Sequence, residues 1–300
     1  MRVFYHPAMI SNSANSSAAA SKEAPFVNGL GMPFVPVPRF STLFCVWPVR
    51  ASDFQAYASD KGVEMPAQAA GSTSDHPVVN VTWHEAGAFC EWLTQRERAA
   101  GSIGSDVVYR LPGDLEWSAA VGLPEEPESN PEKRSGQAEG FPWGSAWPPA
   151  QNAGNYSQEL GVDSFEFTSP VGSFPSNAFG IYDLGGNVWE WCQDRYERTS
   201  DCRVLRGASW FNGYSDRMKS SFRNDLGYPN AQYRGCADCG GRGDQIRKHA
   251  YGYPAVFYRQ CTYRGCLTSG CTGWHQLRIR QHVGGSGVEC AGKKPRIGDR

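Results

Sequence analysis

Two aromatic-rich loops constrain this 300-residue chain more than any other feature. The first reads Gly186-Asn187-Val188-Trp189-Glu190-Trp191, and the second reads Val204-Leu205-Arg206-Gly207-Ala208-Ser209-Trp210. Asn187 and Glu190 lie three positions apart, so both can present oxygens to one hard cation while tryptophan rings fill the space behind them. Loops of this kind are typical of an irregular domain.

The signals for regular structure are few and short. Thr82 and Glu85 form a capping box for a helix, and apolar residues then follow at helical spacing on one face. These are Ala86, Phe89, Cys90 and Leu93. Other helices are predicted from Phe54 to Gly62 and over 114–121, and short strands over 34–38 and 43–47. After Gly122 the chain is loop-rich for about 90 residues, and the few helices and short strands predict an irregular α+β domain.

Several further motifs, in order along the chain, give these loops a family context. They are Gly29–Val35, His76–Trp83, Phe89–Leu93, Tyr109–Trp117, Phe141-Pro142-Trp143-Gly144, Ser169–Gly172 and Phe179–Leu184. Together with the two aromatic loops they resemble the formylglycine-generating enzyme (sulfatase-modifying factor) family over residues 26–226. The resemblance implies the loop-rich, C-type-lectin-like fold of that family.

Composition divides the chain into three parts. Residues 1–25 include a Ser, Ala and Asn stretch that is typical of a flexible leader, and residues 26–232 form the family-like domain. Residues 235–300 carry eleven Lys and Arg against four Asp and Glu, a net charge of +7 within a chain of net charge −1. They also hold six of the ten cysteines. We therefore treat 233–300 as a separate Cys-, Gly- and Arg-rich tail.

Several interpretations of the tail remain open. Cys236-Ala237-Asp238-Cys239 resembles half of a Zn²⁺ site, but Cys261, Cys266 and Cys271 do not supply a second CxxC. Basic charge and aromatic residues allow nucleic-acid binding, which we do not favour, and a disordered segment is the simplest reading. The family's domains end with a Gly-Phe-Arg strand that pairs in the central sheet. None follows here, so a shifted reading frame is the leading interpretation, and it predicts a sheet that lacks a strand.

The family resemblance implies two calcium ions that hold the loops together. The matching positions for one ion are Asn155 and Asp163, with the carbonyls of Tyr156 and Phe165. Those for the other are Asn187 and Glu190, with the carbonyl of Val188. The alternative for Asn187 and Glu190 is that they cap turns through hydrogen bonds to nearby amides. We expect Ca²⁺ at both sets.

The residues that the family's oxidases use for chemistry are missing. Those enzymes hold copper with two cysteines, five apart, just after the motif that corresponds to Gly207–Trp210. Here the two positions are Asn212 and Arg217, which cannot be thiolate ligands, so copper is not expected. An iron-dependent relative would need a histidine set, and the domain offers only His6, His76 and His84. We predict a domain that is not a formylglycine-generating oxidase; an enzyme with altered metal-dependent oxidoreductase chemistry is the alternative.

Ligand binding is the function that remains. Trp210, Asn212, Tyr214 and Arg217, with Phe211, fall where relatives bind a peptide, although Trp210 and Phe211 also suit a core. We expect a peptide or protein ligand. The sequence has no apolar run long enough to span a membrane and no secretory signal, so we expect no membrane association and, by default, a cytoplasmic location.

Overall fold

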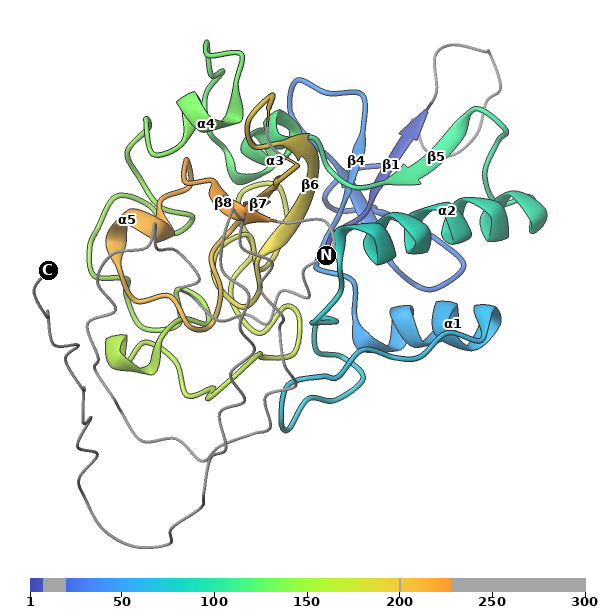
Figure 1. Cartoon of the computed structure of the whole chain (residues 1–300), viewed down its shortest axis with the longest axis horizontal. Helices are drawn as coiled ribbons and strands as arrows, with labels where there is room; N and C mark the ends of the chain where they lie inside the picture. Colours follow the sequence, from blue (N-terminus) through green and yellow to red (C-terminus); the bar gives the residue numbers. More distant parts are fainter. Residues whose placement is uncertain (8–19, 200, 228–300) are drawn as a thin grey trace, which may run out of the picture. The chain divides into compact units, whose positions relative to one another are not determined.

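The computed structural model describes residues 1–7, 20–199 and 201–227 (Figure 1). All of these residues belong to one compact unit of the chain, residues 1–245. The zinc-binding, nucleic-acid-binding and frameshift interpretations of residues 233–300 therefore lie outside the described residues. Residues 8–19 of the predicted leader lie outside them as well.

A five-stranded antiparallel sheet forms the first half of the described chain. Its strands are β1 (Phe4–Pro7), β2 (Phe26–Val27), β3 (Pro33–Pro36), β4 (Leu43–Cys45) and β5 (Val107–Arg110). Their order in the sheet is β2-β3-β4-β1-β5. In register, Tyr5 of β1 lies opposite Leu43 of β4 on one side and opposite Tyr109 of β5 on the other. The first strand of the chain is thus an interior strand of the sheet.

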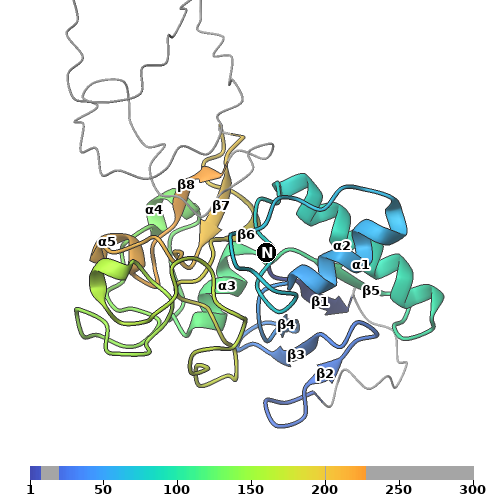
Figure 2. The same cartoon turned by 90° about the horizontal axis from the view of Figure 1, so that it is seen from below.

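Two helices lie on the same side of this sheet, and both were predicted from the sequence, although the first begins three residues before Phe54 (Figures 1 and 2). Helix α1 (Ala51–Lys61) ends at Gly62, whose left-handed conformation suits glycine. Helix α2 (Trp83–Ala99) begins with the predicted capping box, in which the Thr82 side chain accepts from the Glu85 N–H. The predicted apolar face of α2 is buried, so its burial confirms the spacing argument.

The second half of the described chain is mostly loop. A three-stranded sheet of order β6-β7-β8 lies within it, and a few short helices interrupt the loops. These elements are α3 (Asp114–Val121), α4 (Pro131–Arg134), η2 (Gln158–Leu160), β6 (Glu190–Arg195), β7 (Arg203–Arg206), α5 (Ser215–Met218) and β8 (Asn224–Gly227). The result is a mixed, loop-rich architecture with few helices, as the sequence predicts.

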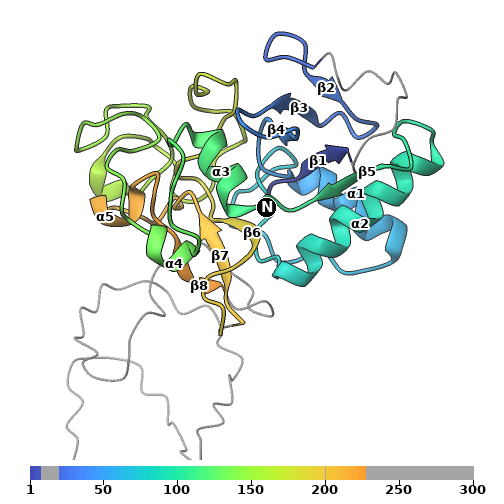
Figure 3. The ribbon, with the colours of Figure 1, turned by 90° about the horizontal axis from the view of Figure 1, so that it is seen from above.

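Helix α3 connects the two sheets through a shared hydrophobic cluster (Figure 3). Trp117 and Ala120 of α3 pack there with Phe44 of the first sheet and with Cys192 and Val204 of the second. Glu116 accepts a hydrogen bond from the Gly113 N–H at 2.7 Å and so caps the helix in place of a side chain at Gly113.

The start of the chain differs from the sequence prediction. Residues 1–25 were expected to form a flexible leader, but residues 4–7 form β1, and Met1, Arg2 and Val3 are buried in the core. The reason is that β1 finds both of its partner strands far along the sequence, where no local pattern indicates them.

Candidate functional site

The loop from Asn155 to Phe165, which we call the calcium loop after the predicted ion set that it carries, closes around the carboxylate of Asp163. Oδ2 of Asp163 accepts from the backbone N–H of Tyr156 at 2.9 Å, and Oδ1 accepts from that of Phe165 at 2.9 Å. Each carboxylate oxygen has more than one lone pair, so both retain capacity for a cation. The structure therefore brings together three of the four residues in the first predicted calcium set.

Asn155, the fourth residue of that set, is fully buried and has one unsatisfied atom. Its Nδ2 donates to the carbonyl of Phe167 at 2.8 Å, but its Oδ1 has no hydrogen-bond partner among the described residues. A buried polar atom left without a partner costs about 1–3 kcal/mol. Amide and carboxylate oxygens are ligands that Ca²⁺ prefers. The residues present therefore fit a calcium ion at this loop.

The second predicted calcium set does not fit an ion. Both oxygens of Glu190 accept from the guanidinium of Arg2, at 2.8–3.1 Å, and Oε2 also accepts from Trp117 Nε1 at 2.9 Å. The Asn187 amide is paired at both ends, because Oδ1 accepts from the Ser169 N–H and Nδ2 donates to the Ser169 carbonyl. Both side chains therefore make structural contacts within the protein. For Asn187 this agrees with the alternative reading, in which its side chain caps a turn through hydrogen bonds to nearby amides. Val188 lies between them and is buried.

Asn187 also connects the two aromatic-rich segments, which were predicted as loops but lie partly in strands β6 and β7. Its backbone N–H donates to the Asn155 carbonyl at 2.8 Å, and its own carbonyl accepts from the Trp210 N–H at 3.0 Å. Its φ of 59° is left-handed, a conformation that asparagine tolerates better than most residues. The calcium loop and the Trp210 segment are therefore joined through one buried residue.

The four predicted ligand-binding residues separate into inward and outward groups. Asn212 is buried, and its Oδ1 accepts from the backbone N–H and the hydroxyl of Ser209 at 2.8 and 3.0 Å. Trp210 is half-buried and meets the Phe167 ring edge-on, with centroids 5.2 Å apart. Tyr214 is 75% exposed, and Arg217 lies half-buried in α5. Asn212 therefore shapes the loop and does not face a ligand.

Phe211 belongs to the exposed surface, although the sequence left its role open. It is 48% exposed and contacts Trp210 at a centroid distance of 5.6 Å. The Ser157 N–H donates to the Asn212 carbonyl at 3.1 Å, so this aromatic segment rests on the calcium loop. We call the exposed pair Phe211 and Tyr214 the aromatic face.

A second aromatic group was missed at the level of sequence. Phe141 and Trp143 stack with centroids 4.7 Å apart, and Trp147 packs against Phe141 with 41% of its surface exposed. Trp143 also meets the Tyr156 ring edge-on at 5.2 Å. The Phe-Pro-Trp-Gly motif could have indicated this group. This second aromatic group contacts the calcium loop at Tyr156. The segment that carries the aromatic face contacts the same loop at Ser157, through the Asn212 carbonyl.

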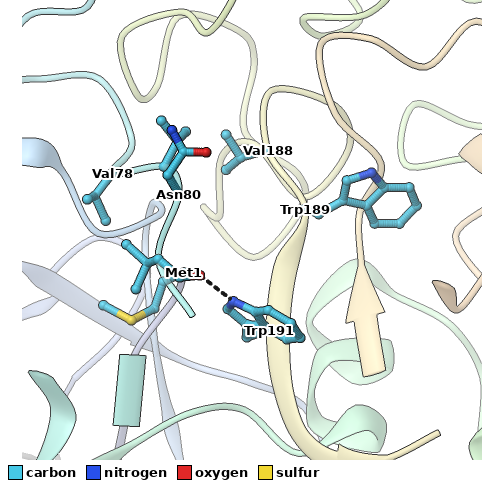
Figure 4. Close-up of a pocket in the computed structure, with 8 residues that line it drawn as sticks. Met1, Val78, Asn80, Val188, Trp189 and Trp191 are labelled. Atoms are coloured by element: carbon cyan, nitrogen blue, oxygen red, sulfur yellow. Dashed lines mark hydrogen bonds between the residues drawn. The ribbon is translucent and has the colours of Figure 1, made fainter. Parts of the chain in front are cut away.

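A small pocket lies elsewhere, between residues 78–81 and 188–191 (Figure 4). Its lining includes Val78, Asn80, Val188 and Trp189, and Trp191 Nε1 donates across it to the Val81 carbonyl at 3.0 Å. Asn80 Nδ2 donates to the Ala67 carbonyl. None of the predicted ligand-binding residues lines this pocket.

Three kinds of titratable group have shifted pKa values: an aspartate, two cysteines and a histidine. Burial raises the pKa of Asp183 to about 6, although its Oδ2 accepts a hydrogen bond from the Gly172 N–H at 2.8 Å. Burial also raises the pKa of the Cys45 and Cys90 thiols to about 12, so neither is a ready thiolate. Burial lowers the pKa of His76, whose Nδ1 lies 2.9 Å from the Thr168 hydroxyl.

Clusters of the kind that hold transition metals are missing from the described residues. Within those residues, no three His, Cys, Asp or Glu side chains come together in a way that could hold a metal ion. The first predicted calcium set contains one carboxylate, that of Asp163, and otherwise consists of amide and carbonyl oxygens. Among the described helices, none combines the length and apolar character that crossing a bilayer requires.

The sequence of these segments matches a known family. A sequence model of the family described as "Sulfatase-modifying factor enzyme 1-like domain" matches residues 44–234. The chain belongs to this family. The match includes both aromatic loops, the calcium loop and the aromatic face. The family membership predicted from the motifs is confirmed.

Individual relatives show how far the similarity extends. The chain is 36% identical over 143 residues to a Mus musculus protein named inactive C-alpha-formylglycine-generating enzyme 2, covering 45% of this chain and 38% of that protein. It is 34% identical over 173 residues to hercynine oxygenase of Mycolicibacterium smegmatis, covering 50% and 34%. The solved structure of PvdO from Pseudomonas aeruginosa is similar at 22% identity and a TM-score of 0.46, over 77% of this chain and 89% of that one. The chain spans less than two fifths of the length of each of these two curated relatives.

Proposed function

We propose that this protein is a calcium-stabilised binding module of the sulfatase-modifying factor family that recognises a peptide or protein ligand and is not a formylglycine-generating oxidase. The observation that carries the proposal is the aromatic face. Phe211 and Tyr214 have large, exposed aromatic side chains. The segment that carries them is held by hydrogen bonds from Ser209 to the Asn212 side chain and from Ser157 to the Asn212 carbonyl. Exposed aromatic residues on a rigid backbone are common in binding surfaces.

The chemistry of the segment supports binding in place of oxidation. Asn212 and Arg217 occupy the positions where the family's oxidases carry their cysteine pair, and neither side chain is a soft-metal ligand. A relative named as an inactive enzyme supports the idea that the fold can serve without this chemistry. We also propose that the fold is C-type-lectin-like. Folds of that kind bind ligands through irregular loops, which agrees with a binding function.

Calcium would act on the loop that supports the aromatic face. Asn155 Oδ1, the Asp163 carboxylate and the carbonyls of Tyr156 and Phe165 would hold the ion. A bound ion supplies charge that satisfies several buried oxygens at once. The loop then keeps Ser157 in place beneath the Asn212 carbonyl, so calcium affinity and ligand affinity are coupled.

A selection on phage-displayed random peptides tests the proposal. Peptides selected on the unaltered protein should lose binding at least tenfold to a Phe211→Ala/Tyr214→Ala variant whose melting temperature is unchanged. Leu115→Ala is the matched control, because Leu115 is also an exposed apolar residue, 40% exposed, but lies on α3. Peptides that bind the double variant as well as the unaltered protein would show that the aromatic face is not the binding surface.

An enzyme with altered metal-dependent oxidoreductase chemistry is the second candidate. The similarity to a protein named hercynine oxygenase favours it. Oxygen consumption with a cysteine-containing peptide, measured after incubation with iron or copper, distinguishes the two functions. Turnover that survives Phe211→Ala/Tyr214→Ala would favour an enzyme, whereas peptide binding without oxygen consumption would favour a binding module.

A further inference from the structure

The part of the chain that contains the calcium loop has negative charge and no positive charge. Residues 135–194 contain no Lys, Arg or His. Their seven acidic residues are Glu139, Glu159, Asp163, Glu166, Asp183, Glu190 and Asp194. The whole chain is nearly balanced, with 29 Lys and Arg against 30 Asp and Glu, so this bias belongs to one region of the domain.

Two of these seven carboxylates have no charged partner within the protein and face solvent. The five that accept hydrogen bonds from other parts of the protein are Glu139, Asp163, Asp183, Glu190 and Asp194. Glu159 and Glu166 are both exposed, and neither forms an ion pair with another residue of the part of the chain that the structure describes. Their charges are therefore available to a ligand.

Glu159 lies next to a contact that supports the aromatic face. It belongs to η2, which begins directly after Ser157. A Cβ built at Gly213 would lie only 3.1 Å from the Ser157 Cβ, so η2 starts against the residue that precedes Tyr214. The yellow-green turn of η2 accordingly lies beside the orange α5, whose N-cap is Tyr214, in all three views (Figures 1, 2 and 3).

Glu166 lies next to a second contact of the same kind. It directly precedes Phe167, whose ring meets the Trp210 ring edge-on at a centroid distance of 5.2 Å. Trp210 in turn contacts the Phe211 ring at 5.6 Å. The two exposed carboxylates therefore lie on the two segments that pack against the aromatic face.

Helix α5 adds one charge of each sign, the exposed Asp216 and the half-buried Arg217. Together with Glu159 and Glu166, the described surroundings of the aromatic face have three carboxylates against one guanidinium. Aromatic rings also attract cations through the negative potential of their faces. Tyr214 is 75% exposed and Phe211 is 48% exposed, so both rings can contact a cationic side chain.

We propose that the ligand of the aromatic face is a peptide segment with a lysine or arginine, whose cation is bound by these rings and by the carboxylates of Glu159 and Glu166. The inference rests on the proposed function, because it names the class of ligand that the aromatic face binds. The long aliphatic stem of either side chain packs on aromatic rings while its charged end meets a carboxylate. Complementary charge around a binding surface also rejects ligands of the same sign, which disfavours nucleic acid.

The composition of peptides selected on the unaltered full chain tests this inference. We expect Lys and Arg to be enriched about twofold or more over the unselected library. Binding of a selected peptide should weaken about fivefold between about 0.1 M and about 1 M salt, because salt screens exposed charges. Selected peptides without this enrichment would overturn the inference and leave the proposed function intact, whereas a failure to select any peptide would overturn both.

A double-mutant cycle separates recognition of the cation from damage to the loop. A selected peptide and its version with glutamine in place of the cation are each titrated into the unaltered protein and into Glu159→Gln/Glu166→Gln, with Ca²⁺ present throughout. Loss of the cation should weaken binding to the unaltered protein about fivefold, but to the variant less than about twofold. Equal losses in the two proteins would refute the inference, because damage to the loop alone affects both peptides alike.

Glu64→Gln/Glu91→Gln is the matched control. Both glutamates are exposed, Glu91 on α2 and Glu64 shortly after α1, and these helices lie across the domain from α5 in every view (Figures 1, 2 and 3). This control should keep the full loss of about fivefold when the peptide's cation is removed. A reduced loss in the control, equal to that in Glu159→Gln/Glu166→Gln, would contradict the assignment of the cation to these two carboxylates.

Discussion

Arg223 Nε donates to both carboxylate oxygens of Asp114, at 3.1 and 3.2 Å, although the two residues lie 109 positions apart. Arg134 and Arg206 bind the same carboxylate, and all four side chains are at most 4% exposed. Asp114 therefore joins the start of α3 to α4, to β7 and to the segment before β8. The buried charges hold the loop-rich half of the domain together.

We predict that Asp114→Asn destabilises the protein by about 3–5 kcal/mol, because three buried guanidinium groups lose their shared anion. Urea denaturation at neutral pH measures the loss. Asp201→Asn is the control, since Asp201 is 84% exposed and pairs with the half-exposed Arg195; we expect no measurable change. Equal stability of both variants would contradict the role assigned to Asp114.

We predict that Asp183 makes stability fall as pH rises. Its folded pKa of about 6 lies above the value of about 4 for an unfolded chain, so the folded protein binds more protons between these values. Stability should fall by up to about 3 kcal/mol from pH 4 to pH 6 and then level off. Asp183→Asn should remove this fall, because asparagine does not titrate. The variant should still fold, since asparagine keeps an acceptor for the Gly172 N–H and tolerates the left-handed φ of 55°.

Denaturation of the unaltered protein and of Asp183→Asn at a series of pH values measures the pH dependence of stability that Asp183 causes. The arginines around Asp114 hold the pKa of that carboxyl well below its usual range, so its contribution is present above about pH 4 and is lost in stronger acid. The two carboxyls therefore act in opposite directions and at different pH. A parallel pH profile for Asp183→Asn and the unaltered protein would rule out the effect of Asp183.

We predict that Gly186→Ala is far more destabilising than Gly31→Ala. The φ values are nearly equal, 78° and 75°, so the backbone strain of alanine, about 1 kcal/mol, is shared. A Cβ at Gly186 would overlap the Asn155 carbonyl oxygen, whereas at Gly31 it would meet nothing within 4 Å. Thermal unfolding of both variants measures the difference. Similar losses of stability in the two variants would mean that the segments carrying Gly186 and Asn155 can move apart at little cost.

We predict that Ca²⁺ raises the melting temperature and that a chelator lowers it. At a concentration of about 100 times its dissociation constant, the ion should add about 2.7 kcal/mol of stability. Asp163→Asn should reduce the response by removing the charged ligand, and Asp201→Asn should leave it unchanged. Calorimetric scans with and without Ca²⁺ measure it. An unaltered melt in both calcium and chelator would remove calcium from the proposed function.

The local features of this protein could be predicted from its sequence. The capping box of Thr82 and Glu85 and the end of α1 at Gly62 depend on residues within one helical turn. Order and spacing of the motifs were enough to indicate the family. The first calcium set also came from the sequence, by resemblance, and three of its members meet around Asp163.

The tertiary structure alone decided which partner each buried polar group has. Glu190 resembles a calcium ligand in sequence, but Arg2 reaches it from 188 positions away and neutralises its charge. Asn212 lies in a segment predicted to bind a ligand, yet its amide turns inward to Ser209. Caps and turns are settled by neighbours along the chain, so the sequence determines them. A buried charge is paired with whichever opposite charge the completed fold brings close, so only the fold decides between an ion, an arginine and solvent.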